Sequence, residues 1–132
     1  MTASHPFRAA VEARDVDGMV ALLAPDVVLH SPVKFQPFEG REAVRALFRA
    51  LFEVFEDFRY TDELAGDGTH ALIFRARVGD RELEGLDLLR AGPDGLLSEV
   101  TVMVRPQSGL QAVGQAVAER LGLVGAGGAG AG

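Results

Sequence analysis

Apolar and polar side chains follow two different periods along the chain, one in each half. In the first half, apolar residues recur every three or four positions, as they do on the buried face of a helix. This spacing predicts two short helices in the first 25 residues, capped by Ser4 and Asp15, and a longer helix over residues 41–55. Between them, Val27–His30 is a β-branched run typical of a short strand, followed by an irregular loop.

From Phe58 onward the apolar period is two, as in strands that bury one face. Three turn sequences divide this region, at Gly66–Gly68, Gly79–Asp80 and Pro93–Gly95. The pattern therefore predicts an antiparallel meander of four long strands. Alternation in the first of these strands places on one face the side chains of Phe58, Tyr60, Asp62 and Leu64.

After the meander, Ser108 is the expected cap of a final helix, and residues 125–132 contain only Gly and Ala. We therefore expect one domain over residues 1–124 and a flexible tail over residues 125–132. The order of elements predicts an α+β fold, in which a curved antiparallel sheet wraps around the N-terminal helices, with the third helix and the C-terminal helix beside them. Such a cone-shaped α+β barrel leaves a concave cavity at its open end, which is a common kind of ligand site.

Composition excludes several classes of function. The chain has 13 Lys and Arg against 19 Asp and Glu, a formal net charge of −6, and no basic cluster, which argues against nucleic-acid binding. It has no cysteine, so disulfides and thiol catalysis are excluded and nothing indicates an oxidising compartment. No apolar run is long enough to span a membrane, and no export signal is visible. We expect a cytoplasmic protein without a membrane partner.

Asp87 is the strongest candidate for chemistry because it interrupts an otherwise apolar strand. Alternation puts it on one face with Leu83, Gly85 and Leu89. A carboxyl group in such surroundings loses hydration, which raises its pKa, and groups held at that cost concentrate at functional sites. The alternative is that Asp87 bonds a buried backbone group or an arginine and only orders the sheet.

His30 and Ser31 are candidate polar partners of Asp87. A neutral imidazole accepts a proton near pH 7, and His30 is the one histidine inside a predicted strand. Strand alternation places His30 and Ser31 on opposite faces, so a loop-anchoring or core role for His30 is the alternative. His5 and His70 lie near a terminus and a turn, where exposure is expected. Three dispersed histidines without ligand spacing predict no metal site.

Aromatic and β-branched residues supply candidate walls for an apolar ligand site, with core packing as the alternative for most of them. Phe35 and Phe38 lie on the predicted loop, where a cavity mouth is expected. The candidate ligand-binding residues are Phe7, Phe35, Phe38, Tyr60, Phe74, Val100, Val102 and Val104.

The order of elements over residues 4–121 resembles the nuclear transport factor 2-like superfamily, the fold of SnoaL-like polyketide cyclases, ketosteroid isomerases and limonene epoxide hydrolases. The resemblance rests on segments that are specific in combination: Asp15–Met19, Ala24–Val28, Pro32, Gly40–Val44, Gly85–Arg90 and Asp94–Leu97. It implies the cone-shaped fold, and a homodimer formed through the convex sheet face that carries Glu99, Thr101, Met103 and Arg105. Because the fold hosts enzymes, binding modules and scaffolds, it leaves the function open.

The ketosteroid isomerase pattern matches this chain at only one of its three catalytic positions. Asp87 stands where that pattern has an aspartic acid that donates a hydrogen bond to an enolate. Ser31, however, stands at the position of the aspartate base, and Phe7 at that of a tyrosine donor. A serine without its own base does not shuttle protons at neutral pH, which argues against steroid isomerisation by that mechanism.

The resemblance and the residues together suggest a SnoaL-like protein that binds a small apolar molecule in its cone. One hypothesis is a cyclase or isomerase that needs no cofactor and uses Asp87 with Ser31 or His30. The alternative is a homodimer that binds a ligand, or another protein, without catalysis. Whether the chain is an enzyme stays open at this point.

Overall fold

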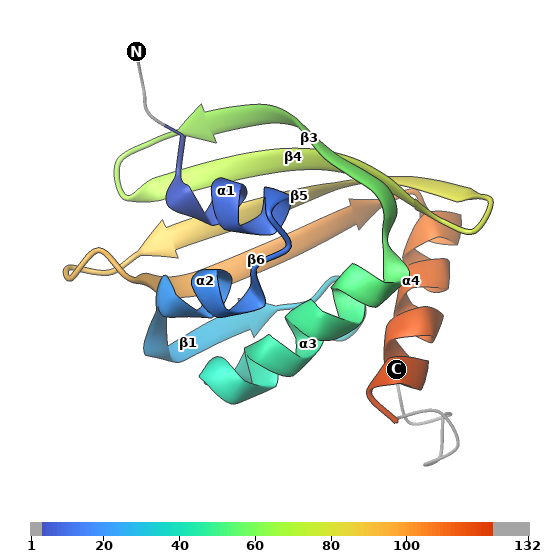
Figure 1. Ribbon diagram of the computed structural model, residues 1–132, viewed down its shortest axis with the longest axis horizontal. Coiled ribbons are helices and arrows are strands. Elements are labelled where there is room, and N and C mark those ends of the chain that lie inside the picture. The colour runs from blue at the N-terminus through green and yellow to red at the C-terminus, as the bar shows by residue number, and fades with distance from the viewer. Residues whose placement is uncertain (1–3, 123–132) are drawn as a thin grey trace.

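The computed structural model describes residues 4–122, which form a curved sheet of six strands with four helices packed on its concave side (Figure 1). The predicted tail, residues 125–132, lies outside the described residues. The helices are α1 (Pro6–Glu12), α2 (Val16–Ala21), α3 (Arg41–Val54) and α4 (Gln107–Arg120). The strands are β1 (Leu23–His30), β2 (Phe38–Glu39), β3 (Glu56–Ala65), β4 (Thr69–Val78), β5 (Arg81–Ala91) and β6 (Leu97–Arg105).

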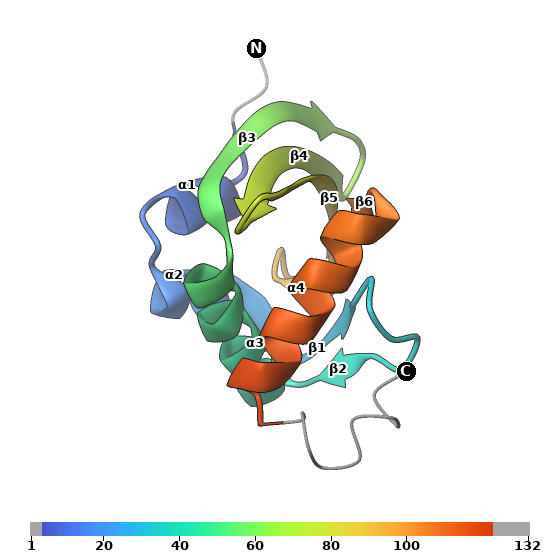
Figure 2. The same ribbon diagram turned by 90° about the vertical axis from the view of Figure 1, so that its right-hand side faces the viewer.

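The strands lie in the order β2-β1-β6-β5-β4-β3, and β1 runs parallel to β6 while the other neighbours are antiparallel. The meander β3–β6 confirms the four predicted strands. Seen from the side, the sheet curls around the helices without closing, and α4 lies across the open side next to α3 (Figure 2). The α+β fold with a curved sheet is therefore confirmed.

The first helix is capped differently from the prediction. His5, not Ser4, is its N-cap, because the His5 Nδ1 atom accepts a hydrogen bond of 3.0 Å from the Phe7 backbone N–H. The Ser4 hydroxyl instead donates to Glu63, at 2.8 Å. The expected exposure of His5 and His70 is also wrong: both are half-buried, and their rings meet edge to face at 4.9 Å.

The prediction that Tyr60, Asp62 and Leu64 share a face is wrong because β3 contains a bulge at Thr61. Tyr60 is opposite Phe74 of β4, but Asp62 is opposite the next residue of β4, so the face reverses there. Asp62 and Leu64 thus face outward, whereas Glu63 faces the helices. There Glu63 accepts hydrogen bonds from the Ser4 hydroxyl, the His5 backbone N–H and the Arg8 guanidinium, which tie α1 to the sheet.

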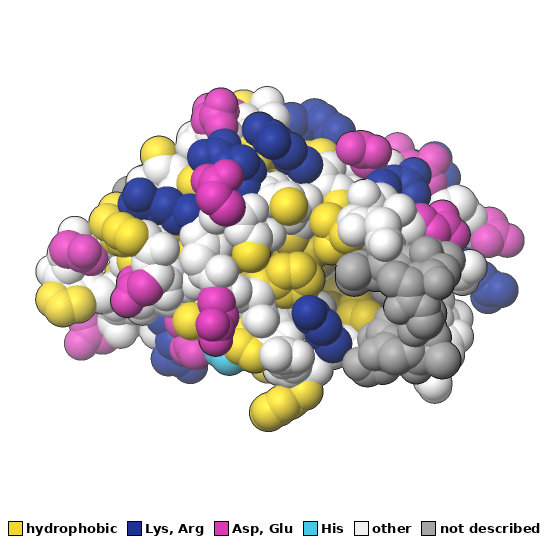
Figure 3. Space-filling view, turned by 90° about the horizontal axis from the view of Figure 1, so that it is seen from below, with side chains coloured by type: hydrophobic (Ala, Val, Ile, Leu, Met, Phe, Trp, Pro, Cys, Tyr) yellow, Lys and Arg dark blue, Asp and Glu magenta, His cyan; other side chains and the backbone are white. Residues whose placement is uncertain are grey.

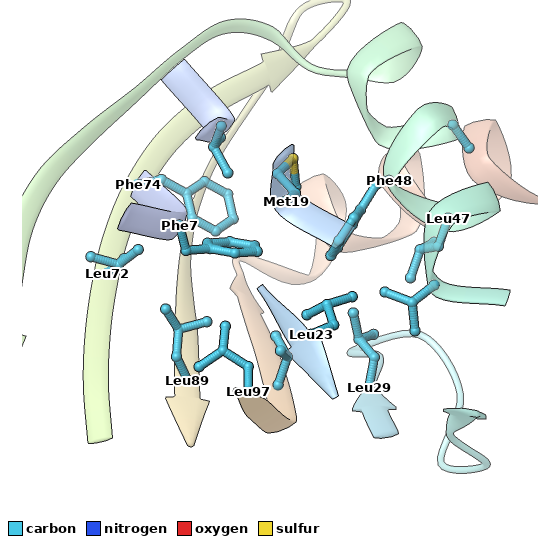
Figure 4. Close-up of a cluster of buried hydrophobic side chains, with 14 of the residues drawn as sticks. Phe7, Met19, Leu23, Leu29, Leu47, Phe48, Leu72, Phe74, Leu89 and Leu97 are labelled. Atoms are coloured by element: carbon cyan, nitrogen blue, oxygen red, sulfur yellow. The ribbon is translucent and has the colours of Figure 1, made fainter. Parts of the chain in front are cut away.

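The core lies between the concave sheet face and the helices (Figure 4). Asp15 caps α2 as predicted, through a 3.0 Å bond from the Gly18 N–H. Helix α4, by contrast, begins directly after Pro106 without the predicted Ser108 side-chain cap. It packs closely on β5 at Gly109, where a β-carbon would lie 2.9 Å from the Leu83 β-carbon. The side chains that are buried most completely are Phe74, Leu23, Leu29, Leu72, Leu89, Leu97, Val27, Val44 and Val100.

Candidate functional site

A cavity of about 620 Å³ lies between the concave sheet face, the helices and the loop that joins β1 to β2. Its wall is mostly apolar, and a cluster of hydrophobic side chains with a Lys or Arg beside it is visible on the face seen from below (Figure 3). All eight residues expected to contact a ligand line the cavity: Phe7, Phe35, Phe38, Tyr60, Phe74, Val100, Val102 and Val104. Ligand binding by these residues stays a prediction.

Asp87 supplies the only carboxyl group that the described residues place in this wall. It lies in the middle of β5, opposite Leu72 of β4 on one side and Val102 of β6 on the other. Alternation therefore predicted its face correctly. Burial among apolar side chains raises the pKa of Asp87 from 3.8 to about 7, although a hydrogen bond from Tyr60 acts in the opposite direction. Near neutral pH, the carboxyl group is thus present in both its acidic and its ionised form.

Tyr60 is the hydrogen-bond partner of Asp87. Its hydroxyl donates to the Asp87 Oδ2 atom at 3.1 Å, and burial, followed by the nearby Asp87, raises the pKa of Tyr60 above its ordinary value. Sequence reasoning placed Tyr60 in the cavity wall but did not pair it with Asp87. The two residues come from β3 and β5, on either side of β4, and their contact depends on a phenol that crosses β4.

Gly85 makes room for the aromatic side chains that orient Tyr60. A β-carbon at Gly85 would lie 2.1 Å from the Cζ atom of Phe74, so only glycine leaves space for that ring. Phe58 stacks on Phe74 with ring centroids 4.8 Å apart, and Tyr60 meets Phe58 edge to face at 5.0 Å. The sequence signal for this arrangement is Gly85, which precedes Asp87 by two residues in an apolar strand and lies opposite Phe74.

Ser31 and His30 lie on opposite sides of the sheet. Ser31 lines the cavity, and its hydroxyl oxygen accepts a 3.0 Å hydrogen bond from the Val33 backbone N–H. The His30 side chain is directed to the outer face, where its Nε2 atom lies 2.8 Å from Glu99. His30 does not line the cavity, so it is not a partner of Asp87.

The loop between β1 and β2 forms one rim of the cavity, against α4. Val33 lies close to Gly114, where a β-carbon would be 3.1 Å from the Val33 Cγ1 atom. Phe35 lines the cavity yet is fully exposed, as expected for a residue at its mouth. The described residues contribute two basic side chains to the wall, and each lies over an aromatic ring. The Lys34 Nζ atom is 4.5 Å from the centroid of the Phe38 ring, and the Arg14 Cζ atom is 4.8 Å from that of the Phe52 ring.

The polar groups of the site are suited to proton transfer and hydrogen bonding. Asp87 supplies an acid that titrates near neutral pH, and Tyr60 holds one of its oxygen atoms. Within residues 4–122, no three His, Asp or Glu side chains meet in a way that would hold a metal ion. None of the helices in the same residues is long and apolar enough to cross a membrane.

Comparison with known proteins places these features among relatives. The family model of the SnoaL-like domain matches residues 5–110. A steroid delta-isomerase from Pseudomonas aeruginosa, known from its crystal structure, is 43% identical, with a TM-score of 0.82 over 86% of this chain and 85% of that chain. An uncharacterised protein with a cystatin-like fold from Silicibacter pomeroyi is 29% identical, with a TM-score of 0.84 over 92% of this chain and 85% of that chain.

A SnoaL-like protein of unknown function from Burkholderia thailandensis shares the fold at 20% identity, with a TM-score of 0.64 over 76% of this chain and 90% of that chain. No curated protein matches the sequence.

Proposed function

The chain belongs to the SnoaL-like domain family, and we propose that it binds a small, largely apolar carbonyl compound with Asp87 as the acid that faces the carbonyl oxygen. The observation that carries this proposal is the Tyr60–Asp87 pair, a carboxyl group held by a hydrogen-bonded partner in a mostly apolar wall. A cavity of about 620 Å³ is within the usual range for sites that bind small molecules.

Each group of the pair has a separate task in this proposal. The Tyr60 hydroxyl occupies the Oδ2 atom of Asp87 and fixes the plane of the carboxyl group. The protonated carboxyl then donates its own hydrogen to the ligand oxygen. Donation at that point stabilises negative charge on the oxygen of an enolate, which isomerisation or cyclisation next to a carbonyl requires. The proposed chemistry needs no cofactor.

The second candidate is a binding protein without catalysis, in which Asp87 only orients the ligand. It is favoured by the environment of Ser31, which stands where the ketosteroid isomerase pattern has its base and whose oxygen accepts the Val33 N–H. Because Asp87 cannot donate its hydrogen to the carbonyl oxygen and at the same time take the proton from the adjacent carbon, an isomerase built on this cavity needs a separate base, and the described part of the wall contains no second carboxyl group and no histidine. Because the Pseudomonas aeruginosa relative is named as a steroid isomerase, steroid ketones belong among the first compounds to test.

A thermal-shift screen followed by turnover assays separates these candidates. The compounds are neutral ketones with steroid, aromatic polyketide and terpene skeletons. A compound at ~100 times its dissociation constant adds about 2.7 kcal/mol to the free energy of unfolding. The proteins are the wild type, Asp87→Asn and, as a matched control, Asp80→Asn, whose carboxylate side chain is 95% exposed at a turn.

If the protein is an enzyme, the wild type and Asp80→Asn convert a bound ketone, and Asp87→Asn does not. A binding protein binds the ketone and converts it in none of the three forms. The absence of any bound ketone contradicts the proposal in both versions.

We also propose that two copies associate through the outer sheet face, as the family resemblance implies. This proposal is supported by Met103 on β6, a large apolar side chain that is 56% exposed on that face. Sedimentation of the wild type as a dimer, and of Met103→Lys as a monomer, is the expected result. A monomeric wild type at micromolar concentration contradicts it.

A further inference from the structure

Lys34 is the only lysine of a chain whose other twelve basic residues are arginines. It lies on the loop between β1 and β2 and lines the cavity, half-buried, with its Nζ atom 4.5 Å from the centroid of the Phe38 ring. Among the described residues, no carboxylate oxygen lies within 4.0 Å of this ammonium group, and no hydrogen-bond acceptor is in reach. The ring of Phe38 is thus its main contact.

Most other basic side chains in the described part of the chain have polar partners, whereas Arg49 has none and is exposed on α3. Arg8 pairs with Glu12 and Glu63, and eight of the twelve arginines lie within 4.0 Å of a carboxylate. Arg14, the second basic residue of the cavity wall, donates a 2.7 Å hydrogen bond to the Phe52 carbonyl and is exposed. In a protein of net charge −6, an ammonium group at the wall of an apolar cavity without an acidic neighbour is a distinct feature.

An ammonium group in this position attracts anions. Coulomb attraction is stronger beside apolar walls than in open water, and a hydrogen bond between two charged groups is about twice as strong as a neutral one. We propose that the ligand carries an acidic group, such as a carboxylate, at one end of its apolar body, and that Lys34 binds this group at the loop end of the cavity. The inference rests on the proposed function, because it concerns the ligand of the same cavity.

The sheet order sets the length of such a ligand. The loop that carries Lys34 follows β1, and β6 separates β1 from β5, which carries Asp87. Two strand spacings, roughly 10 Å, separate β1 from β5, and Lys34 lies four residues beyond the end of β1, so a ligand that reaches both groups needs an apolar body of at least medium length. A carbonyl group beside Asp87 and a carboxylate beside Lys34 therefore fit on one molecule. Because burial raises the pKa of Asp87, this carboxyl group is uncharged in part of the molecules near neutral pH, which reduces its repulsion toward an anion.

The test compares decanoic acid with methyl decanoate, which share an apolar chain and differ in charge. Affinity is measured by calorimetry for the wild type, Lys34→Gln, Lys34→Arg and Arg49→Gln. Arg49 is exposed on α3 and outside the cavity wall, so its substitution removes the same charge without touching the site. We expect the acid to bind the wild type about tenfold more tightly than the ester, with a preference that weakens as salt is added.

The preference should disappear in Lys34→Gln and persist in Lys34→Arg and Arg49→Gln. The single lysine offers a second readout, because reductive methylation with labelled formaldehyde gives one lysine signal in a carbon NMR spectrum. The acid should shift this signal and the ester should leave it in place.

Equal affinities for acid and ester, or a preference that survives in Lys34→Gln, overturn the inference while leaving the proposed function intact. Failure of both compounds to bind also overturns it. The proposed function falls as well only if the neutral ketones of the screen fail to bind.

Discussion

Replacing Asp87 with asparagine keeps the shape of the side chain and removes its acid, so it isolates the cost of a carboxyl group in the apolar wall. Below its ordinary pKa of 3.8, Asp87 is protonated in the folded and the unfolded chain, and the substitution changes little. Between 3.8 and about 7, the unfolded chain releases the proton while the folded protein keeps it. The free energy of unfolding of the wild type therefore falls as the pH rises through this window.

The structure sets an upper limit for the effect. A rise of the pKa from 3.8 to about 7 corresponds to about 4 kcal/mol lost above pH 7. Asp87→Asn removes this cost, so we expect it to be more stable than the wild type by up to about 4 kcal/mol at alkaline pH. For a domain of this size, that difference raises the melting temperature of Asp87→Asn by up to roughly 15 °C.

The assay is chemical or thermal unfolding of the wild type, Asp87→Asn and Asp80→Asn in matched buffers near pH 3 and pH 8.5. Asp87→Asn should be more stable than the wild type at the alkaline pH and nearly equal at the acidic pH. Asp80→Asn, whose side chain is exposed, should follow the wild type at both. The reasoning would be refuted if the stability difference between Asp87→Asn and the wild type were the same at both pH values, or if Asp87→Asn were the less stable protein at pH 8.5. Either result would mean that the folded protein holds ionised Asp87 without a cost in free energy.

Three further substitutions test the contacts around the site. Glu63→Gln should lower the free energy of unfolding by about 1–2 kcal/mol at neutral pH, as measured by urea unfolding. Burial raises the pKa of Glu63, but its three hydrogen bonds outweigh burial and lower the pKa below 4.5. The cost of the substitution should therefore vanish as the pH falls below 4.5. Gly85→Ala should cost about 1–3 kcal/mol, since its methyl group overlaps the Phe74 ring; an unchanged urea midpoint would contradict this. Tyr60→Phe removes a hydrogen bond that lowers the pKa of Asp87, so NMR titration should show a higher pKa in this variant.

Much of the fold was readable from the sequence because its signals are local. The change of period near Phe58 marks the start of the meander, and the glycine-containing turns divide it into strands close to the observed ones. The errors arise where a contact distant in sequence decides the outcome. The bulge at Thr61 turns Glu63 toward α1, and the predicted loop after Ser31 contains a short strand that pairs with β1.

The candidate site divides in the same way. The face that Asp87 shares with Leu83, Gly85 and Leu89 follows from alternation within one strand, and so do the opposite directions of His30 and Ser31. The partner of Asp87 does not, because the Tyr60 hydroxyl reaches it across β4 from a different strand. The isolation of Lys34 also depends on where every carboxylate of the described chain lies, which no local pattern contains.

The parallel pairing of β1 with β6 has a consequence for the order of folding. The meander β3–β6 joins neighbours in sequence, so its hairpins can form early, whereas β1 must wait for a strand that is synthesised much later. On the ribosome, the edge of β1 that pairs with β6 therefore remains unpaired until β6 has emerged. The cavity is assembled last, because β6 contributes to its wall. Until β6 has been synthesised, the apolar lining stays exposed to water, where it promotes aggregation.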